Sequence, residues 1–264
     1  MSIDTYLLAI VVGVITGGVT SLIGASGVMV IVPILTLIFH VGTHSAIGTS
    51  LFVDVIASIT VSYNYYKNGN IDLKRGIWIA LSSIIGAQLG AMFSSQIKEQ
   101  SLSYFFGIAL VISGVLLFVR NSKMKSEDKK PAEKSIRFTK GWQQIVSSII
   151  IGMGIGIFSG MFGAGGGVMI LLALIIILSF PMHIAIGTST LIMAMTALSS
   201  TIGYGVRGYL NLPLGCALAI GAIIGGTLGS RYANNVNELT LQKVVSIVFI
   251  FLGVVMTAIE LNIA

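Results

Sequence analysis

The chain is built from long runs of apolar residues separated by short polar stretches. Runs of about 20 residues recur along its 264 residues, and each is long enough to cross the roughly 30 Å hydrocarbon core of a bilayer as a helix. A transmembrane β-barrel would instead require strands in which apolar and polar residues alternate. The pattern therefore predicts an all-α polytopic membrane protein.

The sequence repeats itself with an offset of about 139 residues. "GASGVM" (24–29) matches "GAGGGVM" (163–169), and "HSAIGTS" (44–50) matches "HIAIGTS" (183–189). Gly17 and Gly86 likewise fall on Gly156 and Gly225. Such self-similarity predicts two structurally equivalent halves. We expect a first transmembrane repeat over 1–120, a cytoplasmic basic linker over 121–141 and a second transmembrane repeat over 142–264.

Each half divides into five apolar segments. We expect helices over 5–23, 28–40, 44–66, 72–94 and 99–120, and over 142–162, 168–180, 184–206, 212–233 and 238–260. The second segment of each half is expected to have about 13 residues, or about 20 Å of helix, which is too short for a full crossing. Short, glycine-bounded segments at matching positions of two halves are typical of a transporter binding site.

Five crossings per half would turn the second half upside down relative to the first. With the N-terminus outside, the inner loops hold twelve basic residues and the outer loops hold only Lys98 and Arg207. We therefore expect two five-helix repeats of inverted topology, with short broken helices at the repeat interface. Both termini are expected outside and the central loop in the cytoplasm. A re-entrant pairing that preserves this parity stays open.

The composition agrees with a membrane protein and argues against a nucleic-acid partner. Only 9% of the residues are charged, against about 25% in soluble domains, and the mean hydropathy is +0.98. Although the net charge is +6, eight of the fifteen basic residues lie between Arg120 and Lys140, where they alternate with acids as in a solvated linker. The single cysteine, Cys216, excludes an internal disulfide, and we expect it to be buried.

A glycine-rich loop follows the first helix of each half. The second, "FGAGGGVMI" (162–170), suggests a nucleotide-binding loop, but such a loop follows a β-strand, and the segment before it here is an apolar helix. We expect a helix interruption whose free amides, at the start of the next helix, favour an anion. The candidate substrate-binding residues are Gly24, Ala25, Ser26 and Gly27 in the first half, and Gly163, Ala164, Gly165, Gly166 and Gly167 in the second.

The repeated "AIGTS" box adds hydroxyl groups near the start of the third segment of each half. Its candidate substrate-binding residues are Gly48, Thr49, Ser50, Gly187, Thr188 and Ser189, with Gln88 of "GAQLG" as a further candidate. The alternative is that these hydroxyls bond back to their own helix. No lysine or arginine lies deep in a span, so amide and hydroxyl dipoles would hold the anion.

Three ionisable residues are candidates for coupling transport to a proton or a cation. Asp54 lies near the middle of its span and has Met193 as its counterpart, and an acid at such depth is usually functional or paired. The alternative is a neutral Asp54 bonded to a neighbour such as Ser58 or to a residue outside its segment. His44 and His183 are equivalent and either cap helix starts or titrate during transport. They do not predict a metal site, and no cofactor is expected.

On these residues the chain resembles the sulfite exporter TauE/SafE family of membrane transporters. The resemblance rests on the loops "GASG" and "GAGGG", the A-x-G-T-S boxes at 46–50 and 185–189, G-x-x-x-G features late in each half and the central basic loop. It implies a secondary carrier of small, typically sulfur-containing anions (sulfite, thiosulfate or organosulfonates) in the cytoplasmic membrane of a prokaryote. Gly42 replaces the proline that Pro181 provides in the second half, and the first loop is one residue shorter, so the preferred anion stays open.

We therefore expect a transporter that moves a small anion across the lipid bilayer by alternating access. An anion channel built on the same repeat is one alternative. A membrane-embedded enzyme is another, but it would need a nucleophile with its base, or a metal constellation, and the chain offers neither. The direction of transport, the coupling ion and the choice between a monomer and a homodimer stay open.

Overall fold

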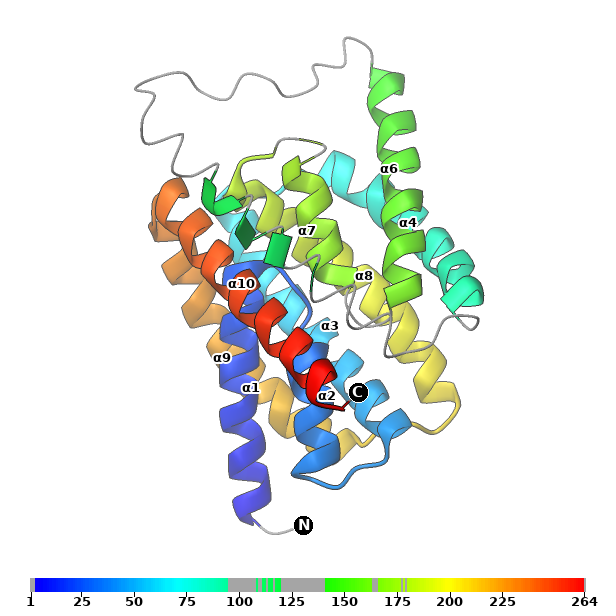
Figure 1. Ribbon diagram of the computed structural model, residues 1–264, viewed down its shortest axis with the longest axis vertical. Coiled ribbons are helices and arrows are strands. Elements are labelled where there is room, and N and C mark those ends of the chain that lie inside the picture. The colour runs from blue at the N-terminus through cyan, green and yellow to red at the C-terminus, as the bar shows by residue number, and fades with distance from the viewer. Residues whose placement is uncertain are drawn as a thin grey trace.

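The computed structural model describes residues 3–94, 141–162, 166–176 and 180–263, with Leu178 and some residues between 108 and 119. These residues form helices, and no strand occurs among them (Figure 1). The first half contains α1 (Ile3–Ile23), α2 (Val28–Leu37), α3 (Thr43–Lys67) and α4 (Leu73–Ser94). The second contains α6 (Gly141–Phe162), α7 (Gly166–Ile176), α8 (Met182–Val206), α9 (Leu212–Asn235) and α10 (Glu238–Ile263).

The long helices begin and end within three residues of the predicted positions. The helix predicted over 99–120 and the linker predicted over 121–141 lie largely outside the described residues. Four described helices, α1, α3, α8 and α9, are long and apolar enough to span a membrane. The all-helical, membrane-spanning class predicted from the apolar runs is thereby confirmed.

Both short helices are shorter than predicted. α2 has 10 residues and α7 has 11, which gives lengths of about 15 and 17 Å. α2 ends because His40 adopts a left-handed conformation with φ 51°, and the Val41 N–H then donates to the Leu35 carbonyl at 2.9 Å. The second half has the equivalent bond, from the Phe180 N–H to the Leu174 carbonyl at 3.0 Å. Neither short helix is long enough to cross the bilayer alone.

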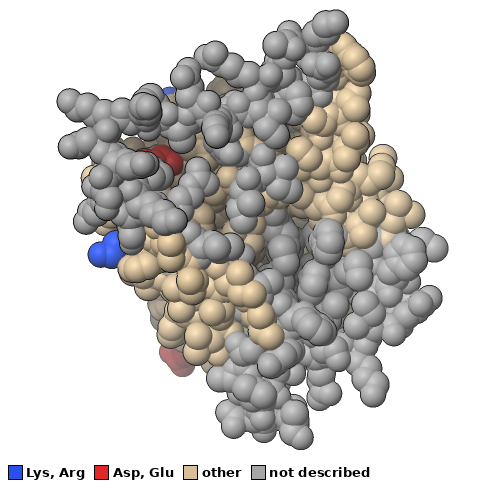
Figure 2. All heavy atoms as spheres, turned by 45° about the horizontal axis from the view of Figure 1, so that its top comes forward, with Lys and Arg blue, Asp and Glu red and all other residues tan. Residues whose placement is uncertain are grey.

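The outer surface of the described residues is largely apolar. Ile59, Ile202 and Leu228 are each more than half exposed, and the face shown in Figure 2 carries few charged side chains among its described residues. The expectation that Cys216 is buried was wrong, because this residue is exposed on α9. Residues on the outward side of a spanning helix face lipid, so an apolar exposed residue there is not unfavourable.

The first helix of each half packs against the other half. α1 packs along α9, and α6 packs along α4 (Figure 1). Glycines make both approaches close, as their four-residue spacing predicts. A Cβ on Gly17 would lie 2.8 Å from Ala222 Cα, and a Cβ on Gly156 would lie 2.8 Å from Ser83 Cα. These two contacts are related by the 139-residue offset.

The order of contacts along these helices gives their directions. Gly13 of α1 faces Gly221 of α9, and Gly18 faces Gly229, so α1 and α9 run the same way. In α6 and α4, Gly152 faces Ile79, and Gly156 faces both Ser83 and Gly86, so this pair also runs the same way.

α3 and α8 pack against each other between these two pairs and run in opposite directions. Gly48, near the start of α3, lies against Tyr204 near the end of α8. Gly187, near the start of α8, lies against Tyr65 near the end of α3. Each contact is the counterpart of the other under the 139-residue offset. The segments that carry the predicted site therefore lie in the middle of the helix assembly.

Candidate functional site

The first glycine loop, Gly24–Gly27, interrupts the helical path between α1 and α2. Gly24 ends α1 with φ +65°, a conformation that favours glycine, and its N–H donates to the Thr20 carbonyl at 2.8 Å. A side chain at Gly24 would also meet α8, because its Cβ would lie 3.0 Å from Ile186 Cα. The amides that follow point from the N-terminal end of α2, where a negative charge is favoured.

Asp54 of α3 accepts hydrogen bonds from this loop. The Ser26 hydroxyl donates to Asp54 Oδ2 at 2.7 Å, and the Gly27 N–H donates to Asp54 Oδ1 at 3.0 Å. The Val28 N–H in turn donates to Ser26 Oγ at 3.2 Å. Asp54 is 3% exposed, so the carboxylate is held inside the protein by the hydroxyl and amide groups predicted to bind an anion. A role of Asp54 in coupling stays a prediction.

The second glycine loop meets the first. A Cβ on Gly167 would lie 2.6 Å from the Ser26 nitrogen and 3.1 Å from Ala25 Cα, and it would also overlap the sulfur of Met193. Met193 is the counterpart of Asp54, so a thioether stands beside the second loop where a carboxylate stands beside the first. Gly166 opens α7, whereas Gly163, Ala164 and Gly165 lie outside the described residues.

Serine hydroxyls of the "AIGTS" boxes bond to their own helices and to the first loop. Ser50 Oγ donates to the Ile47 carbonyl at 2.9 Å, and Ser189 Oγ donates to the equivalent Ile186 carbonyl at the same distance. Ser189 Oγ also lies 3.0 Å from the Gly24 carbonyl. The structure thus joins the second box to the first loop.

Threonine hydroxyls of the boxes contact the opposite half. Thr49 Oγ1 accepts from the Asn211 N–H at 2.9 Å, and Thr188 Oγ1 accepts from the Asp72 N–H at 3.1 Å. Gly48 and Gly187 permit these contacts, because a Cβ at either site would overlap a backbone carbonyl of the same connection. The box of the first half therefore contacts the start of α9, and the box of the second half contacts the start of α4. Whether the boxes also bind substrate stays a prediction.

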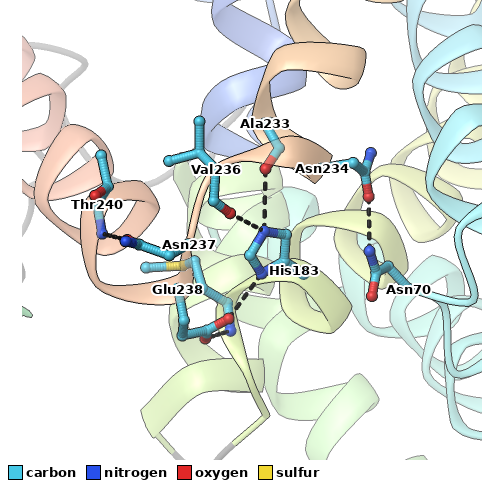
Figure 3. Close-up of polar contacts among 9 residues, drawn as sticks. Asn70, His183, Ala233, Asn234, Val236, Asn237, Glu238 and Thr240 are labelled. Carbon is cyan, nitrogen blue, oxygen red and sulfur yellow. Dashed lines mark hydrogen bonds and ion pairs between the residues drawn. The ribbon is translucent and has the colours of Figure 1, made fainter.

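The two histidines have different surroundings. His183 Nδ1 lies 2.7 Å from Glu238 Oε2, and its Nε2 lies 3.0 Å from the carbonyls of Ala233 and Val236 (Figure 3). Acceptor oxygens face both ring nitrogens, and only the protonated ring can donate from both. His44 is exposed, and its ring centroid lies 5.2 Å from that of Tyr209.

Glu238 was not predicted from the sequence. It is the first residue of α10, and it also accepts a hydrogen bond from the Met182 N–H at the start of α8. His183 and Glu238 together fasten the start of α8 to the connection between α9 and α10. The signal available in the sequence was an acid at the first residue of the helix predicted over 238–260.

Two further polar side chains lie near the loop: Thr20 was not singled out from the sequence, and Ser58 was named there only as a possible partner of Asp54, a bond that does not form. The hydroxyls of Thr20 and Ser58 are buried and have no hydrogen-bond partner. Thr20 Oγ1 lies 3.4 Å from the position that a Cβ on Gly27 would take, and Ser58 follows Asp54 by one turn of α3. Gln88 lies in α4, but its side chain is outside the described part. Within the described residues, no three His, Cys, Asp or Glu side chains come together to hold a metal ion.

This fold and site define a multi-pass helical membrane protein in which two halves meet at interrupted helices, as in many membrane transporters. A model of the sulfite exporter TauE/SafE family matches residues 9–256, so the chain belongs to this family of membrane transporters. The resemblance inferred from the glycine loops and boxes is thereby confirmed.

Relatives from bacteria and archaea match over nearly their whole length. The chain is 30% identical to "Probable membrane transporter protein YunE" of Bacillus subtilis, over 94% of this chain and 96% of that protein. It is 28% identical to YdhB of the same organism, over 90% and 95% of the two chains. It is 27% identical to MJ0441 of Methanocaldococcus jannaschii, over 94% of each chain. The chain has no significant match among solved structures.

Proposed function

We propose that this protein is a secondary transporter of small, sulfur-containing anions such as sulfite, thiosulfate or an organosulfonate. The observation that carries the proposal is the hydrogen bonding at the first loop. There Ser26 and Gly27 already hold a carboxylate, at 2.7 and 3.0 Å, inside the protein. Oxyanions of sulfur present acceptor oxygens of the same kind, and such charge-assisted bonds are stronger than neutral ones.

The proposed substrate site lies where the two broken helices meet. Its donors are the amides and hydroxyls of Ser26, Gly27 and the start of α7 at Gly166 and Gly167, with Ser189 beside them. No lysine or arginine occurs in the described parts of α2, α3, α7 or α8 away from their ends. A site made of dipoles binds an anion without a fixed countercharge, which favours its later release.

The proposed mechanism is alternating access between two inverted halves. It is supported by the opposite directions of the equivalent helices α3 and α8 and by the packing of α1 and α6 against the other half. Rocking of one half against the other would expose the site to each side in turn. The distribution of basic residues favours an orientation with both termini outside and the loop between α4 and α6 in the cytoplasm. A homodimer, and coupling through Asp54, His44 or His183, belong to the same proposal.

Flux and counterflow in proteoliposomes test the proposal. Vesicles are loaded in turn with sulfite, thiosulfate, sulfoacetate, sulfate or acetate, and protein-free vesicles serve as the control. We expect saturable movement of one or more sulfur anions and uptake of labelled anion driven by unlabelled anion on the other side. Large currents without counterflow would identify a channel. Folded protein that moves none of these anions would refute the substrate class.

A further inference from the structure

Asp54 occupies hydrogen-bond donors that an anionic substrate would need. The Ser26 hydroxyl and the Gly27 N–H both point at its carboxylate. A donor hydrogen that is committed to Asp54 is weakened or lost as a donor to a second anion. Two negative charges at the same loop would also repel each other in a medium of low polarity. An ionised Asp54 and a bound anion therefore compete.

A hydroxyl of α1 beside the first loop is free to make a further hydrogen bond. Thr20 is 1% exposed, and its hydroxyl has no partner. This hydroxyl faces the loop, since Oγ1 lies 3.4 Å from the position of a Cβ on Gly27. Buried polar groups in proteins are almost always bonded. A ligand with more oxygens than a carboxylate would supply the partner that Thr20 lacks.

A second unpartnered hydroxyl, that of Ser58, lies one helical turn beyond Asp54 on α3. Ser58 is fully buried, has no partner, and follows Asp54 by four residues on the same face of α3. A carboxylic acid, unlike a carboxylate, can donate a hydrogen bond. Once protonated, the Asp54 side chain can turn from the loop and donate to Ser58 Oγ.

No other charged group competes for this role in the described helices around Asp54. Ser26 and Gly27 supply its hydrogen bonds. α2 and α7 contain no ionisable residue. The ionisable residues of α1, α8 and α9 lie toward the ends of those helices. On α3 itself, besides Asp54, His44 lies in the first turn, and the others lie within the last five residues, where Tyr65 donates to the Ser21 carbonyl; these are Tyr63, Tyr65, Tyr66 and Lys67. Those of α1, α8 and α9 are Asp4, Tyr6, His183, Tyr204, Cys216, Arg231 and Tyr232.

We propose that Asp54 is a built-in competitor of the substrate and that a proton controls it. In the ionised state its carboxylate holds Ser26 and Gly27 and excludes the anion. In the protonated state it turns to Ser58, and the anion binds to Ser26, Gly27 and Thr20. Each anion then binds together with one proton, which couples anion movement to a pH gradient. This inference rests on the proposed function, because it requires a substrate anion at the first loop.

Equilibrium binding of labelled thiosulfate to the full-length protein in lipid nanodiscs tests the inference. Thiosulfate keeps its charge from about pH 5 to pH 8, so the pH dependence reports on the protein. Where Asp54 is ionised, we expect the Kd of the wild-type protein to rise about tenfold per pH unit, as for one linked proton. Asp54→Asn keeps the shape and removes the charge, so its Kd should be low and independent of pH. Asp54→Ala should behave in the same way and covers the case in which the asparagine variant fails to fold.

Substitutions of the two unpartnered hydroxyls complete the test. Thr20→Val should raise the Kd about tenfold at every pH, because it removes one hydrogen bond to an anion. Its matched control is Thr16→Val, one turn earlier on α1, where the hydroxyl bonds to the carbonyls of its own helix. That control should leave the Kd unchanged. Ser58→Ala should move the pH dependence to lower pH, because the protonated carboxyl loses its partner.

The outcomes separate the two proposals. An Asp54→Asn variant with the pH dependence of the wild-type protein would overturn the inference. So would a variant that no longer binds at any pH, because Asp54 would then be a ligand and not a competitor. In both cases binding by the wild-type protein would leave the proposed function standing. Absence of binding by the wild-type protein and by every variant, all shown to be folded, would refute the proposed function itself.

Discussion

Replacing Gly156 by alanine tests the close approach of α6 to α4. A Cβ at this position would lie 2.8 Å from both the carbonyl carbon and the Cα of Ser83 and would overlap its carbonyl oxygen. Ordinary contacts of a Cβ lie at 3.4–4 Å, so the two helices would have to separate. Because the opposing atoms belong to the backbone, no side-chain rotation can relieve the overlap.

The expected cost follows from two opposing effects. Overpacking of a close interface costs about 1–3 kcal/mol, and a backbone contact lies at the upper end of that range. Alanine recovers about 1 kcal/mol over glycine through its helix propensity. We therefore expect Gly156→Ala to lower the free energy of unfolding by about 1–2 kcal/mol. Gly17→Ala should cost the same, because its Cβ would meet Ala222 in the equivalent way.

Gly154→Ala is the matched control. It lies two residues away on α6, and a Cβ there would have no atom within 4 Å. This variant should be neutral or stabilised by up to about 1 kcal/mol through propensity alone. Reversible unfolding in mixed detergent micelles, followed by circular dichroism, measures all three variants. Equal free energies for Gly154→Ala and Gly156→Ala would refute the close approach of α6 to α4.

Two further predictions concern the polar contacts between the halves and at the end of α9. Thr49→Val removes the acceptor of the Asn211 N–H and should cost about 1–3 kcal/mol, whereas Thr49→Ser should retain most of the stability. The same unfolding assay decides between them, and equal losses would contradict the role of the hydroxyl. His183→Phe should cost about 1–2 kcal/mol through its lost hydrogen bonds. The equivalent His44→Phe should stay within about 0.5 kcal/mol because His44 is exposed, and comparable thermal unfolding of the two variants would contradict this difference.

Helix positions were largely predictable from the sequence, and the ends of the short helices were not. A chain in lipid must satisfy every backbone amide internally, so an apolar run long enough to cross becomes a helix and polar residues mark its ends. Inside an apolar run no such mark exists. α2 stops at Leu37 because His40 turns left-handed, and the residues between them, Ile38 and Phe39, are apolar and do not mark the earlier end.

The candidate site was predictable as a set of segments but not as a set of contacts. The repeated loops and boxes identified the parts of the chain that meet at the centre. The bond between Asp54 and Ser26 joins residues 28 positions apart, and the bond between Thr49 and Asn211 joins residues 162 apart. Residues so far apart in the sequence are brought together by tertiary packing, which neither hydrophobic periodicity nor helix propensity predicts. The acceptor role of the Thr49 hydroxyl was missed for this reason.

Contacts that recur in both halves differ from those found in one half only. Gly17 and Gly156 make equivalent contacts, and so do Thr49 and Thr188, so these positions are explained by holding two similar halves together. At one pair of equivalent positions in the middle of the spans, α3 carries a buried acid, Asp54, and α8 carries Met193. A scaffold has no need of a buried acid in only one half, whereas coupling of one proton to one anion needs a single such group. The departure from symmetry is thus the strongest reason to look for the coupling chemistry at Asp54.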